Sequence, residues 1–154
     1  MEPLRADPGI RAIAVGALMA TGILSACSGG DLGFTTISAD RFPPIGPTVT
    51  LSGVVDVRFN GCIHLQTGTE APWVVWPPGA EQMSDAQGAA IRLADGTILR
   101  HDSPVDIEGE VMTRAGLPEG GDPDSMWGAY SGFCLGTEIN NDREILRAAT
   151  VTLR

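Results

Sequence analysis

Residues 48–61, TVTLSGVVDVRFNG, decide the fold of this 154-residue chain. Apolar and polar residues alternate along the stretch with a period of two, which is typical of a β-strand with one buried face. Only Gly53 interrupts the alternation, and it predicts a bulge or sharp bend of the kind that turns a strand around the corner of a small barrel. Asn60-Gly61 then marks the turn of a β-hairpin.

The register of this hairpin follows from which side chains can be buried together. A two-residue turn would place apolar residues of the second strand opposite charged residues of the first. A three-residue loop over 59–61, with Gly61 in the left-handed conformation, instead pairs apolar with apolar residues. Because a slip of one residue inverts every side chain, burial favours the second register. It pairs Val57 with Ile63 and Val55 with Leu65, and leaves Asp56, Cys62 and His64 on the other face.

Further short strands follow along the chain, bounded by turn residues or containing glycine. We predict them at 73–76, 90–93, 97–100, 105–113 with a bend at Gly109, and 145–153; residues 133–135 are a short apolar stretch. Residues 80–88 and 114–131 are predicted as loops, because they are polar and small or rich in Gly, Pro and Asp. No helix longer than two turns is expected, although a short one could form at 81–88 or 141–147.

About six short strands separated by turns predict an all-β domain, either a small antiparallel barrel or a sandwich. Residues 105–111, VDIEGEV, have the form V-x-I-x-G-x-V and follow a turn at Asp102-Ser103-Pro104. This pattern resembles the middle of an OB-like barrel, in which such a strand curls at its glycine. The resemblance spans roughly residues 48–154 in pattern, and it implies a fold and no activity.

The first 27 residues carry a separate signal. Residues 12–26 are uncharged and mostly apolar, and Cys27 follows them directly in the run Leu24-Ser25-Ala26-Cys27. A helix of about 15 residues rises about 22 Å, short of the roughly 30 Å hydrocarbon core, so a stable transmembrane span is not expected. The segment resembles the signal peptide of bacterial lipoproteins, in which Leu24, Ser25 and Ala26 would be recognised by the signal peptidase.

The resemblance implies that residues 1–26 are removed and that Cys27 carries a diacylglycerol as the first mature residue. It also implies a fatty-acyl chain, such as palmitate, on the new amino group. Two or three chains hold a protein far more firmly than one, so the protein would be anchored to the cell membrane on its extracytoplasmic face. If the host has an outer membrane, the lipid could be anchored in that membrane instead. The alternatives are an ordinary secretory signal with an incidental cysteine, or a cytoplasmic protein.

Composition limits what the remaining chain can do. Residues 27–47 are rich in Gly and Pro and are expected to form a flexible tether, and 48–154 then form one domain. The formal net charge is −9 and the chain contains no lysine, so it would repel phosphate backbones. Nucleic acid is therefore excluded as an expected partner.

Three cysteines become two once Cys27 is lipidated. In an oxidising compartment, Cys62 and Cys134 are expected to form a disulfide, with two separate buried thiols as the alternative. A disulfide also argues against a catalytic cysteine, because an oxidised sulfur has no thiolate.

Three groups of residues could bind a ligand. Cys62 and His64, with Asp56 across the hairpin, could form a metal corner, but an exposed histidine beside a disulfide is favoured. Glu119, Asp122 and Asp124 are interpreted as a solvated acidic loop rather than a calcium site. Trp127 and Tyr130 could cover the barrel or contact a ligand.

No hydrolase motif is present, and His101-Asp102-Ser103 is interpreted as a turn rather than a catalytic triad, because adjacent residues cannot aim at one another. We therefore expect a non-catalytic binding or scaffold module of the cell envelope, without cofactor or metal. Its partner would be an envelope protein or polymer that the sequence does not identify, and no oligomeric state is indicated. The alternatives are a metal or small-ligand carrier, or an envelope enzyme using Asp106, Glu108 and Glu110.

Overall fold

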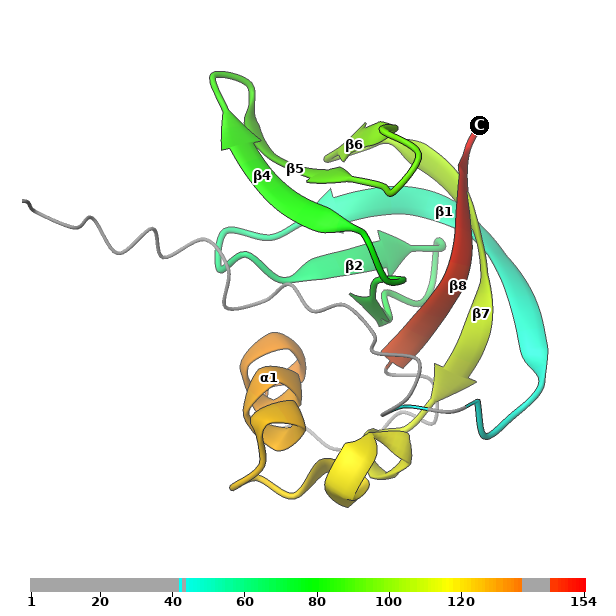
Figure 1. Ribbon diagram of the computed structural model, residues 1–154, viewed down its shortest axis with the longest axis vertical. Helices are drawn as coiled ribbons and strands as arrows, with labels where there is room; N and C mark the ends of the chain where they lie inside the picture. The colour runs from blue at the N-terminus through cyan, green and yellow to red at the C-terminus, as the bar shows by residue number, and fades with distance from the viewer. Residues whose placement is uncertain (1–41, 43, 137–144) are drawn as a thin grey trace, which may run out of the picture.

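The computed structural model describes residues 42, 44–136 and 145–154 (Figure 1). Eight strands, one α-helix and two short 3₁₀ helices lie in this part of the chain. In order they are β1 (Thr48–Val57), β2 (Ile63–Gln66), β3 (Trp73–Val75), β4 (Glu81–Asp85), β5 (Gly88–Arg92), β6 (Ile98–Arg100), β7 (Pro104–Met112), η1 (Arg114–Gly116), η2 (Pro118–Gly121), α1 (Met126–Leu135) and β8 (Ile145–Leu153).

Five of the strands close into a barrel in the order β1-β2-β3-β8-β7. β1 is shared between two neighbours: residues 48–54 pair with β7, and residues 54–57 pair with β2. β3 and β8 are parallel, whereas the other barrel pairs are antiparallel. The predicted all-β class and small OB-like barrel are therefore confirmed. The sheet is mixed, however, and not purely antiparallel as predicted.

The first hairpin has the predicted register. Val55 pairs with Leu65 and Val57 with Ile63, so these apolar side chains share the interior face. The loop spans residues 59–61, because the N–H of Arg58 donates to the Cys62 carbonyl at 2.9 Å. Gly61 has φ 84°, the left-handed conformation that this loop requires.

Two glycines allow β-strands to cross closely at the corners of the barrel. The register of β7 shifts between Glu108 and Gly109, which confirms the predicted bend. A Cβ atom at Gly109 would overlap the carbonyl of Arg147 on β8. Gly53 stays in register, so no bulge forms there; a Cβ atom at this position would instead overlap the carbonyl of Gln66. Both glycines are needed for close approach of backbones.

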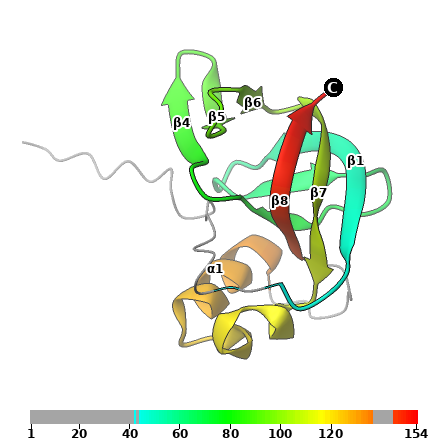
Figure 2. The ribbon, with the colours of Figure 1, turned by 45° about the vertical axis from the view of Figure 1, so that its right-hand side comes forward.

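The segment predicted as a loop or short helix, residues 80–88, is instead the first part of a second sheet. β4, β5 and β6 pair in that order, and Gly88, with φ 104°, lies at the tight connection between β4 and β5. The strands predicted at 90–93 and 97–100 are joined by a turn, in which the N–H of Gly96 donates to the Leu93 carbonyl at 2.9 Å. Figures 1 and 2 show this sheet at one end of the barrel and α1 at the other.

Two apolar clusters hold the fold together, one on each side of β3. The first fills the barrel and extends under the β4–β6 sheet, with Trp76 fully buried among Ile63, Leu65, Ile91, Leu99 and Ile107. The second lies on the opposite face of β3 and includes Trp73, Val75, Ile145, Leu117 and Trp127. Trp73 and Trp76 thus lie in different clusters, and the segment that includes α1 covers Trp73.

The folded domain extends to Phe42 rather than beginning at Thr48. The Phe42 ring is buried in the second cluster, and the Arg147 guanidinium lies 5.1 Å from its centroid. The N–H of Ile45 donates to the Glu110 carboxylate at 2.8 Å, and Arg147 donates to the same carboxylate at 3.2 Å. Glu110 is only 3% exposed, so this pair joins the segment before β1 firmly to the barrel.

Candidate functional site

Helix α1 spans Met126–Leu135, within and just beyond a segment predicted as a loop. It begins at Ser125, whose Oγ accepts a hydrogen bond from the N–H of Gly128 at 3.0 Å. The same hydroxyl donates to the Asp122 carbonyl at 2.6 Å, which fixes the approach of the preceding loop. Ser125 is therefore the N-cap that satisfies one of the free N–H groups at the start of the helix.

Replacing Ser125 by alanine should lower the free energy of unfolding by about 1 kcal/mol, because both hydrogen bonds of the cap are lost. S125T retains a hydroxyl and should recover most of that loss. Urea denaturation of both variants measures the change in the free energy of unfolding. S84A is the control, because Ser84 is exposed on β4. If the free energy of unfolding falls as much in S125T as in S125A, the cap hydrogen bonds of the hydroxyl do not account for the loss of stability.

The inner face of α1 is packed against the barrel. Trp127 is 8% exposed, and its ring lies 5.4 Å from that of Phe42, measured between centroids. Gly128 lies so close to the backbone of Asp122 that a Cβ atom would overlap the Asp122 carbonyl. Trp127, one of the two residues predicted to cover the barrel or contact a ligand, thus belongs to the second apolar cluster.

The outer face of α1 is exposed and apolar. Met126 is 60% exposed and Phe133 is 45% exposed. These two side chains, together with Ala129 and Tyr130, line an open hollow of about 330 Å³. Tyr130, the second predicted contact residue, therefore lies at a surface that a ligand could reach. No residue of the helix carries a charge, so the face has no ionic group of its own.

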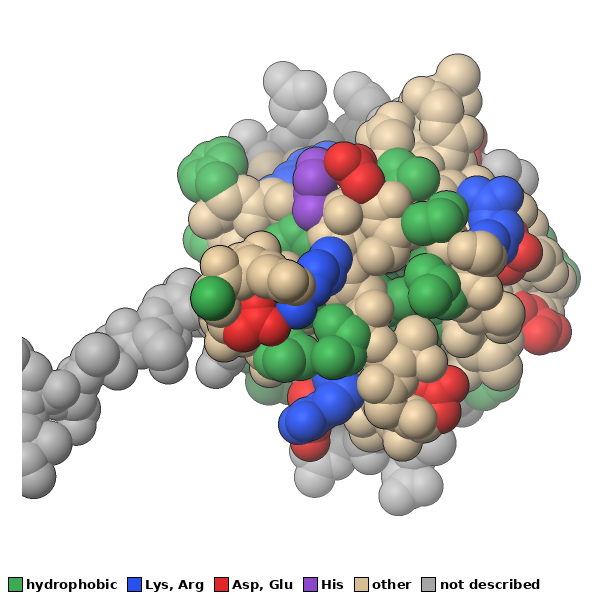
Figure 3. Space-filling view, turned by 90° about the horizontal axis from the view of Figure 1, so that it is seen from above, with side chains coloured by type: hydrophobic (Ala, Val, Ile, Leu, Met, Phe, Trp, Pro, Cys, Tyr) green, Lys and Arg blue, Asp and Glu red, His purple; other side chains and the backbone are tan. Residues whose placement is uncertain are grey.

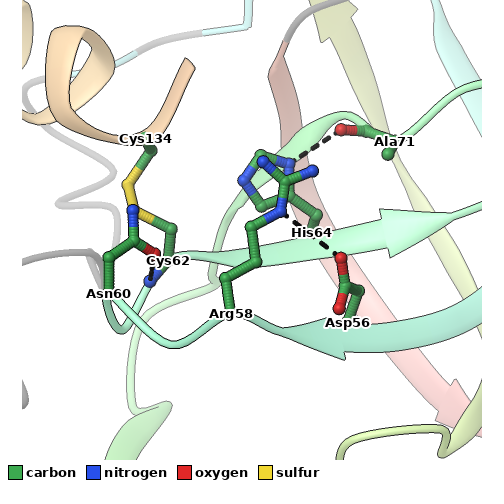
Figure 4. The surroundings of a disulfide bond; sticks show 7 residues. All are labelled: Asp56, Arg58, Asn60, Cys62, His64, Ala71 and Cys134. Atoms are coloured by element: carbon green, nitrogen blue, oxygen red, sulfur yellow. Dashed lines mark hydrogen bonds and ion pairs between the residues drawn. A yellow bond between two sulfur atoms is a disulfide. The ribbon is translucent and has the colours of Figure 1, made fainter. Parts of the chain in front are cut away.

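The predicted disulfide between Cys62 and Cys134 is confirmed. It joins the loop before β2 to the last turn of α1, with the two Cα atoms 5.5 Å apart and a sequence separation of 72 (Figure 4). Cys62 is fully buried and Cys134 is 4% exposed. The bond therefore fixes the C-terminal end of the helix against the first hairpin.

His64 lies on β2 beside this disulfide and is buried, not exposed as predicted. Its Nδ1 donates to the Ala71 carbonyl at 2.8 Å. Burial lowers the pKa of His64 to about 4, with a smaller contribution in the same direction from Arg58. The carbonyl of Ala71, the carboxylate of Asp56 and the carbonyl of Cys134 oppose this shift without reversing it. The ring is therefore neutral at physiological pH.

The metal corner considered for this hairpin loses its sulfur ligand, because Cys62 is in the disulfide. Asp56 instead lies near Arg58, at 3.4 Å. Within residues 42, 44–136 and 145–154, no group of three His, Cys, Asp or Glu side chains is arranged to hold a metal ion. Glu119, Asp122 and Asp124 are exposed, and Asp122 accepts the N–H of Asp124 at 2.9 Å.

The three carboxylates of β7 that were considered for catalysis each have a separate partner. Asp106 accepts the Ser52 hydroxyl at 2.6 Å, Glu108 accepts that of Thr150 at 3.3 Å, and Glu110 pairs with Arg147.

The predicted turn at residues 101–104 is confirmed. There the Ser103 hydroxyl accepts a hydrogen bond from the N–H of Arg100 at 2.8 Å. The N–H of Ser103 in turn donates to the Arg100 carbonyl at 3.0 Å.

The signal-peptide residues Leu24, Ser25, Ala26 and Cys27 lie outside the described residues. Within the described part, no helix is long and apolar enough to cross a membrane. No protein-family model, curated protein or solved structure matches the chain. Fold and site together define a small mixed β-barrel protein with a disulfide-fixed helix at one end.

Proposed function

We propose that the chain is a bacterial lipoprotein in which a lipid on Cys27 holds an OB-like barrel at the extracytoplasmic face of the cell membrane. The observation that carries the proposal is the run Leu24-Ser25-Ala26-Cys27 after an apolar segment too short to span a bilayer. The pairing of the other two cysteines supports it, because structural disulfides persist in oxidising compartments. The mature protein would begin at Cys27, and residues 28–41 would connect the lipid to the domain.

We propose further that the domain is a non-catalytic binding or scaffold module of the cell envelope. The carboxylates offered by the sequence for acid–base chemistry support this, since each is engaged by a hydroxyl or a guanidinium group. The histidine most favourably placed for a metal site, His64, is buried and donates to the Ala71 carbonyl at 2.8 Å. The apolar face of α1 is exposed and offers a surface for binding.

The lipid anchor is tested by expressing the full chain in a bacterium and measuring the mass of the product by mass spectrometry. The product should begin at Cys27 and carry the added mass of a diacylglycerol, and it should sediment with membranes. The C27S variant should lack the lipid and leave the membrane fraction, because one side chain supplies the whole attachment. A parent protein that starts at Met1, unmodified and recovered from the cytosol, would overturn the proposal.

A further inference from the structure

We propose that the outer face of α1 rests on the lipid bilayer that holds Cys27, so that the domain docks on the membrane by this helix. Met126, Ala129, Tyr130 and Phe133 follow each other at short intervals along one side of the helix, as its period of 3.6 residues requires. Two of them are large apolar side chains exposed to about half or more of their area. An exposed apolar patch around a hollow marks a surface that contacts something else.

The place where the N-terminal segment joins the domain indicates the bilayer as the partner. The described chain begins at Phe42, and Phe42 packs directly on Trp127 of α1. This step rests on the proposed function: if Cys27 carries lipid, about 15 residues separate the bilayer from Phe42. Even fully extended, a chain of that length spans at most about 50 Å. The anchor would therefore keep α1 near the membrane and raise the effective concentration of the lipid surface there.

The opposite end of the molecule has a different surface. Figure 3, which looks onto that end, shows charged side chains interspersed among the hydrophobic ones. Two of its ion pairs, Arg92 with Glu81 and Arg100 with Asp85, lie on the β4–β6 sheet. Contact with a bilayer there would remove these charges from water at a large cost, whereas α1 has no charged residue to desolvate.

The size of the patch argues against a second copy of the chain as its partner. A helix of ten residues is about 15 Å long, and one side of it falls far short of the roughly 800 Å² that each partner contributes to a stable protein interface. Shallow insertion beside an existing lipid anchor needs much less area, because the anchor supplies most of the affinity. Asp122 and Asp124, exposed just before the helix, favour uncharged over anionic head groups.

Quenching of an introduced tryptophan tests this contact. A129W places the probe on the outer face of α1, and I98W places a matched probe on β6, where Ile98 is 44% exposed. The full chain, purified from bacterial membranes and reconstituted into phosphatidylcholine vesicles, is compared with and without brominated acyl chains. The parent protein gives the background from the three native tryptophans. We expect the added A129W emission to be quenched about twofold or more relative to that of I98W, because only α1 reaches the acyl boundary.

A second variant and the mass of the same samples separate the possible failures. F133D in the A129W background should reduce the quenching, since a carboxylate replaces an inserted ring, and vesicles of phosphatidylglycerol should give weaker quenching. Equal quenching of A129W and I98W in lipidated protein would overturn the docking and leave the anchor intact. Cys27 without lipid would remove both proposals. A dimer in detergent that F133D dissociates would assign the face to a second copy and overturn the bilayer contact.

Discussion

The C62A/C134A variant should unfold with a free energy about 4 kcal/mol lower than that of the parent chain. The disulfide closes a loop between residues 72 positions apart, and a loop of that length removes about that much conformational free energy from the unfolded chain in the entropy model. Both cysteines are nearly or fully buried, so alanine fills each site with a smaller apolar group and leaves no polar atom unsatisfied. The midpoint of urea denaturation should fall by about 2 M.

The comparison is made in a C27S background, so that neither chain carries lipid, and S84A on the exposed side of β4 in the same background is the control. S84A should leave the urea midpoint unchanged within error. Hydrogen exchange adds a local measurement: α1 should lose protection before the barrel strands in C62A/C134A, since the bond fixes the last turn of the helix. An unchanged midpoint in C62A/C134A, with the disulfide present in the parent by mass, would show that the bond contributes nothing to stability.

The β-hairpin and its register could be predicted because the information is local. Alternation between apolar and polar residues places Val55, Val57, Ile63 and Leu65 on one face, and Gly61 permits the three-residue loop. The parallel pairing of β3 with β8 could not be predicted in the same way. The two strands are about 70 residues apart in the sequence. Their local sequence patterns are equally compatible with antiparallel pairing to another strand.

Helix α1 escapes prediction because it lacks a polar face. Its outer side chains, among them Met126 and Phe133, are as apolar as the inner ones, so no helical period separates buried from exposed positions. Gly128 and Gly132 lower its intrinsic helix propensity further. The available signals were at its ends: Ser125 is a favourable N-cap, and Gly136 follows the last turn.

The burial of His64 also depends on contacts distant in sequence. On the hairpin alone, the face that it shares with Cys62 and Asp56 is the outer one, which predicts exposure. α1 and the loop that carries Ala71 cover that face in the folded domain. Sequence patterns identify which face of a strand points into the barrel, but not whether a second layer covers the other face.

His64 should make the domain less stable in mild acid. Burial holds its pKa at about 4 in the folded protein, against 6.5 for an ordinary histidine. Between these values the unfolded chain binds a proton that the folded protein does not, so stability is full above about pH 6.5 and falls as the pH decreases toward 4. A tenfold change in proton affinity is worth about 1.4 kcal/mol, so the total loss is about 3 kcal/mol.

Two measurements isolate this effect from the titration of carboxylates. The chain has two histidines, and H101N leaves His64 as the only one, so its ring can be titrated directly by NMR. Urea denaturation of H101N and H101N/H64Q between pH 7.5 and 4 then compares chains that share every carboxylate. Because the glutamine side chain changes the packing at this buried site, the two chains are compared in their pH dependence and not in their absolute stability. Between pH 7.5 and 4, the free energy of unfolding of H101N/H64Q should fall by about 3 kcal/mol less than that of H101N. Parallel curves, or a ring that titrates near 6.5, would show that the folded protein accepts the proton on His64 and that burial does not exclude it.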